Sequence, residues 1–362
     1  MAVNRIDPWG SVLVEDYERI IEQFGLEHFD QKIFPDPNRL MRRGIVFAGR
    51  DLQRIATCIE EKKPYYVLTG FMPTNDHLHF GNKMVVEMVR YFQDHGAHTY
   101  ILVADLEASA VRKVSLEEAR KRALSFHIPA YIALGLDPAK TTFYFQSQNR
   151  DVVQLAFTFA QKITLAEFKA IYGKADPSRI MSALTQSGDI LYPQLKERMP
   201  GIIPVGVDQD PHIRLTRDIV RRTKETKFFL PSAIMCKYTP SLQGDLKMSK
   251  SKPESCIELP EDDAIVKKKI MRAISGGRST LEEHRRLGGE PEKCMVFELL
   301  KQHLIESDDE LQKIYDEYKS GRMTAGEIKQ LAARKMTAFM EKMREDMKKA
   351  ASLKLNFISF KT

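Results

Sequence analysis

Residues 65–92 read YYVLTGFMPTNDHLHFGNKMVVEMVRYF, and this stretch decides the fold. The run up to Gly70 is rich in aromatic and β-branched residues, which favours a short strand. The next twelve residues, 71–82, are rich in turn formers. Apolar residues then recur at the spacing of one helix face: Val85, Met88, Val89 and Phe92. Strand, loop and helix in this order predict the opening of a βαβ unit.

The same alternation continues toward the carboxyl terminus. The apolar run 99–104 predicts a buried strand, and Ser115 with Glu118 forms a capping-box pattern at the start of a helix. TTFYFQS at 141–147 and IIPVGVD at 202–208 predict two more strands, the second short and apolar as in a parallel sheet. The fold class is therefore α/β, with a Rossmann-like parallel sheet.

Two regions depart from the alternation. Residues of about 150–195 show helical patterns without a strand, which predicts a helical insertion in the α/β domain. From about residue 258 only amphipathic helices follow. We predict an amino-terminal extension and a Rossmann-like catalytic domain over 1–257, then an all-α domain over 258–362.

Composition limits the class of protein. The 362 residues contain 43% hydrophobic and 29% charged residues, and no apolar run approaches the ~20 residues of a bilayer span. The start, MAVNRIDPWG, lacks the pattern of a secretory signal, so we expect a cytoplasmic protein without a membrane partner. The formal charge of +7 suits a polyanionic partner, although many basic proteins bind no nucleic acid. The cysteines form no C-x-x-C pair and are expected to be reduced packing residues: Cys58, Cys236, Cys256 and Cys294.

The first chemical signature is His79-Phe80-Gly81-Asn82, where the predicted helix begins. A helix amino terminus offers free N–H groups and a positive dipole end to phosphates, and a glycine lets a ligand approach the backbone. This string resembles the HIGH motif of class I aminoacyl-tRNA synthetases, with Asn82 in place of the final histidine. An isolated match of this length is common in unrelated proteins.

The second signature lies in the segment 244–253, GDLKMSKSKP. Lysines on a mobile loop can follow the charge that builds on a departing pyrophosphate, while hydroxyl groups hold phosphate oxygens. The run from Lys247 to Ser251 resembles the KMSKS loop of the same class. The alternative is a solvated basic loop.

The third signature, GVDQDPHIRLTRD at 206–218, follows a predicted strand, where ligands bind in open α/β sheets. It looks like the tryptophanyl-tRNA synthetase version of a nucleotide-binding motif. By this resemblance Gly206 and Asp208 face the nucleotide and Gln209 approaches the amino acid. The alternative is that Asp208 and Asp210 only cap the next helix.

Two further stretches resemble the tryptophanyl-tRNA synthetases, in particular their archaeal and eukaryotic branch: IDPWGSVLVEDYERIIEQFG at 6–25 and SGGRSTLEEHRRLGG at 275–289. Tyrosyl-tRNA synthetases share the first three motifs but do not usually carry these two. The resemblance implies activation of L-tryptophan with ATP and Mg²⁺, and transfer to tRNA(Trp). It also implies a homodimer joined through the insertion, an anticodon-binding domain over 258–362, no protein-bound metal and no DNA partner.

The resemblance also implies which residues form the site. Those expected to bind ATP are Thr74, His79, Gly81, Asn82, Gly206, Asp208, Lys247, Met248, Ser249 and Lys250. Four of them would stabilise the transition state as catalytic residues: His79, Asn82, Lys247 and Lys250.

Tryptophan must be selected by a polar partner for its indole N–H. Asp189 aligns with the acidic residue that bacterial enzymes aim at this nitrogen, and Glu107 and Gln186 match eukaryotic residues around the amino group and ring. Leu68 and Leu102 replace a eukaryotic pocket tyrosine and glutamine, so we assign the indole to Asp189. The alternative is that Asp189 is a capped or surface residue of a helix.

Three rival functions remain. A tyrosyl-tRNA synthetase would differ in its amino acid. A nucleotidyltransferase that makes a nucleotide cofactor would bind no RNA, and the long helical carboxyl-terminal region argues against it. A non-catalytic RNA-binding relative is expected to have lost Lys247 or Lys250, and both are present.

Overall fold

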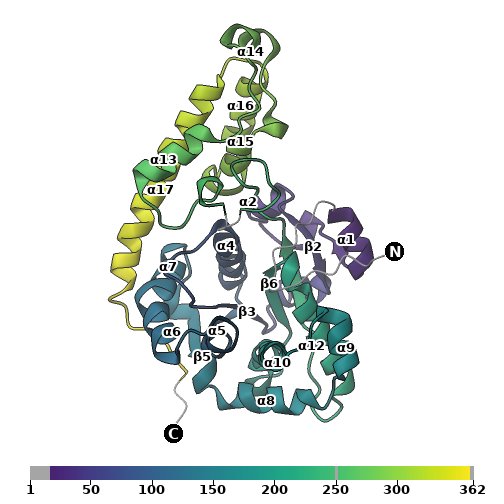
Figure 1. The fold of residues 1–362 in the computed structure, drawn as a ribbon. Coiled ribbons are helices and arrows are strands. Elements are labelled where there is room, and N and C mark those ends of the chain that lie inside the picture. Colours follow the sequence, from purple (N-terminus) through teal and green to yellow (C-terminus); the bar gives the residue numbers. More distant parts are fainter. Residues whose placement is uncertain (1–16, 249–251, 359–362) are drawn as a thin grey trace.

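The computed structural model describes residues 17–248 and 252–358, and a seven-stranded sheet runs through this part of the chain (Figure 1). The strands are β1 Glu27–His28, β2 Val46–Arg50, β3 Tyr66–Phe71, β4 His98–Val103, β5 Thr141–Phe145, β6 Gly201–Gly206 and β7 Ser232–Cys236. Their order is β1-β2-β7-β6-β3-β4-β5. The five strands from β7 to β5 are parallel, which confirms the predicted fold class.

The strands β1, β2 and β7 are absent from the sequence prediction, and β2 pairs with β7 in the antiparallel direction. The partners Gly49 and Ile234 lie far apart in sequence. Nothing in a local hydrophobic pattern fixes the direction of such a distant pairing.

Helices cover both faces of the sheet. Up to β7 they are α1 Tyr17–Phe24, α2 Arg39–Arg42, α3 Leu52–Glu60, α4 Phe80–Asp94, α5 Asp105–Arg112, α6 Leu116–Arg122, α7 Ile128–Ala133, α8 Arg150–Ala160, α9 Leu165–Tyr172, α10 Pro177–Leu191, α11 Pro193–Lys196 and α12 Asp210–Arg222. Helices α8 to α11 separate β5 from β6, where the sequence predicts the insertion. Ser115 caps α6 by accepting a hydrogen bond from the Glu118 N–H, as its pattern predicts.

Among the described residues of the carboxyl-terminal region, the regular elements are helices joined by loops, with isolated β-bridges at Leu259 and Phe357. The region contains α13 Asp263–Arg272, α14 Leu281–Leu287, α15 Met295–Leu299, the π-helical turn η8 Leu300–Leu304, α16 Asp308–Lys319 and α17 Ala325–Ala350. A capping box between Thr324 and Glu327 opens α17. This long helix runs back along α7 (Figure 1). The chain then reaches the edge of the sheet, where the Phe143 N–H donates to the Asn356 carbonyl.

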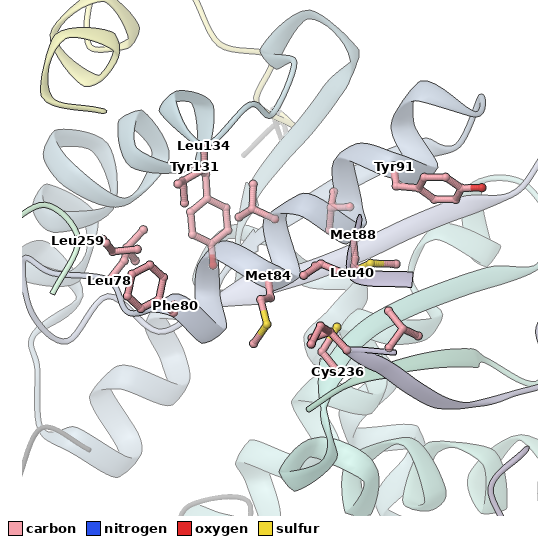
Figure 2. Packing of buried hydrophobic residues seen from close by; sticks show 14 of the residues in the cluster. Leu40, Leu78, Phe80, Met84, Met88, Tyr91, Tyr131, Leu134, Cys236 and Leu259 are labelled. Carbon is pink, nitrogen blue, oxygen red and sulfur yellow. The ribbon is translucent and has the colours of Figure 1, made fainter. Parts of the chain in front are cut away.

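Alternate residues of β3 supply two apolar cores, because successive side chains of a strand point to opposite faces. Val67 belongs to a core with α4, α7 and the carboxyl-terminal helices, whereas Leu68 packs with α8, α10 and α12. Figure 2 shows part of the first core, including Met84 of α4 and Tyr131 of α7. Helix α17 therefore shares a continuous core with the α/β region.

Every helix within residues 17–248 and 252–358 is too short or too polar to cross a lipid bilayer. The four cysteines are buried thiols, and burial raises the pKa of Cys236 to about 12. A thiol with this pKa stays protonated at neutral pH, so it is a poor nucleophile.

Candidate active site

A cavity of about 410 Å³ opens at the carboxyl ends of β3 and β6. The chain passes from β3 through β4 to β5 and then returns to β6 on the other side of β3. Where the connections that follow two adjacent strands run in opposite directions along the sheet, a crevice forms between the two strand ends. Open α/β sheets bind ligands in this crevice. The fold thus produces the cavity by its topology.

Most of the predicted site residues line this cavity: His79, Gly81, Asn82, Glu107, Gln186, Asp189, Gly206, Asp208, Gln209, Lys247 and Met248. Thr74 lies outside the lining, and its carbonyl accepts a hydrogen bond from the Arg122 guanidinium. Ser249 and Lys250 fall outside the described residues. Segments separated by more than a hundred residues therefore meet around one space.

The HIGH-like segment forms the amino terminus of α4. His79 is the N-cap: its Nδ1 accepts from the Asn82 N–H at 3.4 Å, and Asn82 Oδ1 accepts from the His79 N–H at 3.1 Å. This reciprocal capping box fixes the first turn and uses two of its donors. The N–H groups of Phe80 and Gly81 at the start of the helix lie at its positive dipole end. A Cβ at position 81 would approach the His79 ring to 3.0 Å, so the glycine preserves this arrangement.

The GVDQ segment and the KMSKS-like loop meet across the cavity. Lys247 Nζ lies 3.7 Å from Asp208 Oδ2 and 4.4 Å from the ring centroid of Tyr238. A Cβ at Gly206 would lie 2.5 Å from Asp208 Oδ1, so a larger residue there would displace this carboxylate from its position beside Lys247. Helix α12 begins after Gln209, whose side chain makes no capping hydrogen bond. The Asp210 carboxylate instead pairs with Arg50 and Arg214, and that of Asp208 lies near Lys247.

The cavity lining also includes two buried carboxylates, Glu107 and Asp189. Gln146 Nε2 donates to both, at 2.9 Å from Glu107 Oε1 and 2.5 Å from Asp189 Oδ2. The Tyr144 hydroxyl donates to Asp189 Oδ1 at 2.9 Å. Ser182 and Gln186 donate to Glu107 Oε2, each at 2.7 Å. The alternative of a surface position for Asp189 is wrong.

Burial raises the pKa of Glu107 and of Asp189, because a carboxylate loses hydration in the protein interior. The hydrogen bonds from Gln146 oppose this shift for both groups. The Glu107 charge raises the pKa of Asp189 further. A cationic or N–H ligand between these carboxylates would relieve the cost of burying them.

Sequence reasoning missed several residues of the site. Tyr131 and His212 line the cavity, and His212 Nδ1 lies 2.9 Å from the Tyr172 hydroxyl. Burial lowers the pKa of His212 to about 3, so its imidazole is neutral. Gln146 directly follows β5, and it is not among the predicted site residues although the segment 141–147 that contains it is predicted as a strand. Its position at a strand carboxyl end was the available signal.

Comparison with known proteins identifies the family. Residues 60–341 match the family of class I tRNA synthetases for tryptophan and tyrosine. The chain is 40% identical to the tryptophan–tRNA ligase of Methanocaldococcus jannaschii, with 100% of both chains covered. It is 40% identical to the crystal structure of the Aeropyrum pernix tryptophanyl-tRNA synthetase, with a TM-score of 0.87 over 96% of this chain and 97% of that one.

The chain belongs to the archaeal-type tryptophanyl-tRNA synthetases of class I. The Plasmodium falciparum tryptophanyl-tRNA synthetase has the same architecture, with 26% identity and a TM-score of 0.84 over 94% of this chain and 95% of that one. The first three motifs could not separate the tryptophan and tyrosine branches of the family. Full-length similarity to tryptophan–tRNA ligases separates them, as the stretches at 6–25 and 275–289 predict.

Proposed function

We propose how the residues of this chain divide the work of tryptophan–tRNA ligation, the activity that family membership assigns to it. Tryptophan occupies the end of the cavity with the buried carboxylates, and ATP occupies the end between the start of α4 and the Lys247 loop. The observation that supports this division is a single cavity lined by both groups of residues.

Asp189 accepts a hydrogen bond from the indole N–H, while Glu107 and Gln186 bind the amino group and ring edge. Gln209, also in the lining, approaches the amino acid. Leu68 and Leu102 line the same cavity and offer apolar contact to the indole ring. An amino acid without an indole N–H would leave the buried Asp189 carboxylate without this donor, which disfavours its binding.

The first step is attack of the tryptophan carboxylate oxygen on the α-phosphorus of ATP. A new P–O bond gives tryptophanyl-adenylate, and the bond to the β-phosphate oxygen breaks to release pyrophosphate. His79, Asn82, Lys247 and Lys250 stabilise the developing charge electrostatically. Gly81, Gly206 and Asp208 receive the base and ribose, and Met248 and Ser249 complete the ATP contacts. A contact from Thr74 rests on the family resemblance alone, because Thr74 lies outside the cavity lining.

Mg²⁺ enters as part of the MgATP substrate. Within the described residues no cluster of three potential ligand side chains could hold a metal ion by itself. In proteins Mg²⁺ commonly keeps several waters and binds through substrate phosphates. The ion would neutralise charge on the departing pyrophosphate.

In the second step a hydroxyl of the terminal tRNA ribose attacks the activated carbonyl. An ester bond forms, the bond to the phosphate breaks, and AMP leaves. The helical region 258–362 binds the anticodon of tRNA(Trp), consistent with the basic balance of the chain. Because tRNA charging serves translation, we propose that the enzyme acts in the cytoplasm.

We further propose that two chains associate through the helical insertion. Phe157 of α8 is 66% exposed and Leu165 of α9 is 55% exposed, and Met181 of α10 is also exposed. Large exposed apolar side chains gathered on one segment are typical of an interface.

Amino-acid-dependent ATP–pyrophosphate exchange tests this function, with tryptophan and tyrosine supplied separately and without tRNA. We expect exchange with tryptophan alone. Exchange with tyrosine alone would overturn the assignment of Asp189 while keeping the reaction. Exchange with neither would overturn the reaction and favour the nucleotidyltransferase or RNA-binding alternatives.

A further inference from the structure

His303 lies where the carboxyl-terminal helices meet both nucleotide-binding segments. It belongs to η8 and is buried. Its ring stacks on Phe80, with centroids 4.1 Å apart and an interplanar angle of 21°. Its Nε2 lies 2.9 Å from Thr239 Oγ1. One side chain from the helical region therefore contacts two segments of the catalytic region.

Each residue that His303 contacts is joined directly to a segment proposed to bind the nucleotide. Phe80 is the first residue of α4 and directly follows the N-cap His79. Figure 2 shows Phe80 beside Leu78 and Leu259 at this end of the helix. The Thr239 carbonyl accepts a hydrogen bond from the Met248 N–H at 3.0 Å. The His303 ring thus lies between the two segments that approach ATP.

The surroundings of His303 keep it neutral and in place. Burial and the nearby charges of Lys83 and Arg39 hold the pKa of its imidazole well below the usual range. Both cations pair with Glu87 of α4, and Arg39 also pairs with Glu306 just after η8. The ion pairs join η8 to α4, while His303 Nδ1 has no hydrogen-bond partner within the described residues. A neutral imidazole offers one donor and one acceptor, so Thr239 is its defining polar contact.

We propose that His303 is a positioning residue for ATP, holding the start of α4 and the Thr239–Met248 contact at a fixed separation. The inference rests on the proposed function, because it takes these two segments as the ATP site. By this proposal the helical region helps to shape the ATP site, and so contributes to amino-acid activation even when tRNA is absent. Neither Phe80 nor Thr239 is among the residues that hydrogen-bond to Glu107 and Asp189, the carboxylates proposed to bind tryptophan.

Two substitutions remove the same hydrogen bond from opposite sides. His303→Phe keeps an aromatic ring on Phe80, and Thr239→Val keeps the volume of the threonine. Each should raise the KM for ATP about three- to tenfold in pyrophosphate exchange, the range expected for one buried hydrogen bond. The KM for tryptophan should stay within about twofold. The double variant should be no worse than either single variant, because both delete one interaction.

His303→Gln tests rescue, because its amide can donate to Thr239 although it cannot stack as an imidazole does. It should recover part of the ATP affinity that His303→Phe loses. His284→Phe is the matched control: His284 is also buried and also has an Nδ1 without a partner within the described residues, but it contacts Met323 and Tyr318 in the helical region. This control should leave the KM for ATP within about twofold of wild type.

The proposal is overturned if Thr239→Val leaves the KM for ATP unchanged, or if it raises both KM values equally. Additive losses in the double variant would also contradict it, since independent effects would then be at work. If His303→Phe fails to fold, Thr239→Val alone decides the outcome. Absence of tryptophan-dependent exchange in the wild type would instead overturn the proposed function, so the two failures are distinguishable.

Discussion

The two ends of the cavity are built differently. At the end where we propose that tryptophan binds, both oxygens of Asp189 and both oxygens of Glu107 accept hydrogen bonds from buried or half-buried side chains. At the end where we propose that ATP binds, Lys247 lies on a loop with 29% of its side chain exposed, and its carboxylate partner Asp208 is 3.7 Å away. One end is a closed hydrogen-bond network and the other a loose ion pair.

This difference matches what each substrate requires. Discrimination between amino acids depends on buried polar groups whose positions cannot adjust to the wrong ligand. Stabilising a departing pyrophosphate requires charges that move with it, which a loop can provide. We therefore expect substitutions at the two ends to change different kinetic constants.

The largest expected effect is at the ATP end. Lys247→Met should lower kcat in tryptophan-dependent pyrophosphate exchange by about 10²–10³, because a charge that acts in the transition state is lost. The KM for tryptophan should change little. Lys252→Met is the control in the same stretch of sequence: Lys252 pairs with Asp245 at 2.9 Å, and its loss should leave kcat within about twofold. Equal losses in both variants would mean that only the overall charge of the loop matters.

The next effect is at the tryptophan end. Asp189→Asn should lower kcat/KM for tryptophan by about 10- to 100-fold, because the indole N–H loses a charged acceptor. The preference for tryptophan over phenylalanine, measured as the ratio of kcat/KM values, should fall with it. Asp105→Asn is the control, since Asp105 is buried but bonds to Ser147 and lies outside the cavity lining. An unchanged preference in Asp189→Asn would remove Asp189 from indole recognition.

The same variant tests the cost of the buried carboxyl. The pKa of Asp189 is raised by burial, so the folded protein binds this proton more tightly than the unfolded chain does. Its stabilising contribution is complete below the ordinary pKa near 3.8 and is lost as pH rises through the raised pKa. Relative to wild type, the Tm of Asp189→Asn should therefore rise by about 1–3 °C between acidic and neutral pH. A difference in Tm that stays constant with pH would contradict the raised pKa.

The smallest kinetic effect concerns the insertion behind the tryptophan end. Phe157→Glu should shift the mass measured by light scattering from a dimer toward a monomer, because a charge replaces an exposed apolar contact. Helix α8 packs on α10, which carries Gln186 and Asp189, so any kinetic change should fall on the KM for tryptophan. Leu353→Glu is the control, at an exposed apolar position after α17. A mass unchanged by Phe157→Glu would move the interface elsewhere.

Local sequence signals were sufficient for much of the fold. The strand at Tyr66, the helix after His79 and the cap at Ser115 each depend on a few adjacent residues, and the structure contains them. The motif residues around the cavity could also be predicted, because the motifs at His79 and Gly206 lie where a helix begins or a strand ends, and the Lys247 motif is a recognisable loop sequence. The division of the chain into two domains at residue 257 remains a prediction. Helices α17 and α4 lie on either side of this boundary in sequence and share one hydrophobic core.

Contacts between distant segments could not be predicted in the same way. Gln146 bridges Glu107 and Asp189, and His303 joins Phe80 to Thr239, yet each is surrounded in sequence by an ordinary helix or strand pattern. Their roles depend on how elements pack after folding. The pairing of β2 with β7 was missed for the same reason.

Two-substrate pyrophosphate exchange tests the central claim most directly, with tryptophan and ATP both varied for wild type, Asp189→Asn and Lys247→Met. The predicted result is a crossed pattern: Asp189→Asn raises the KM for tryptophan and leaves the KM for ATP unchanged, whereas Lys247→Met lowers kcat and leaves the KM for tryptophan unchanged. If both variants change the same constants in the same proportion, the two ends do not act separately and the account is wrong.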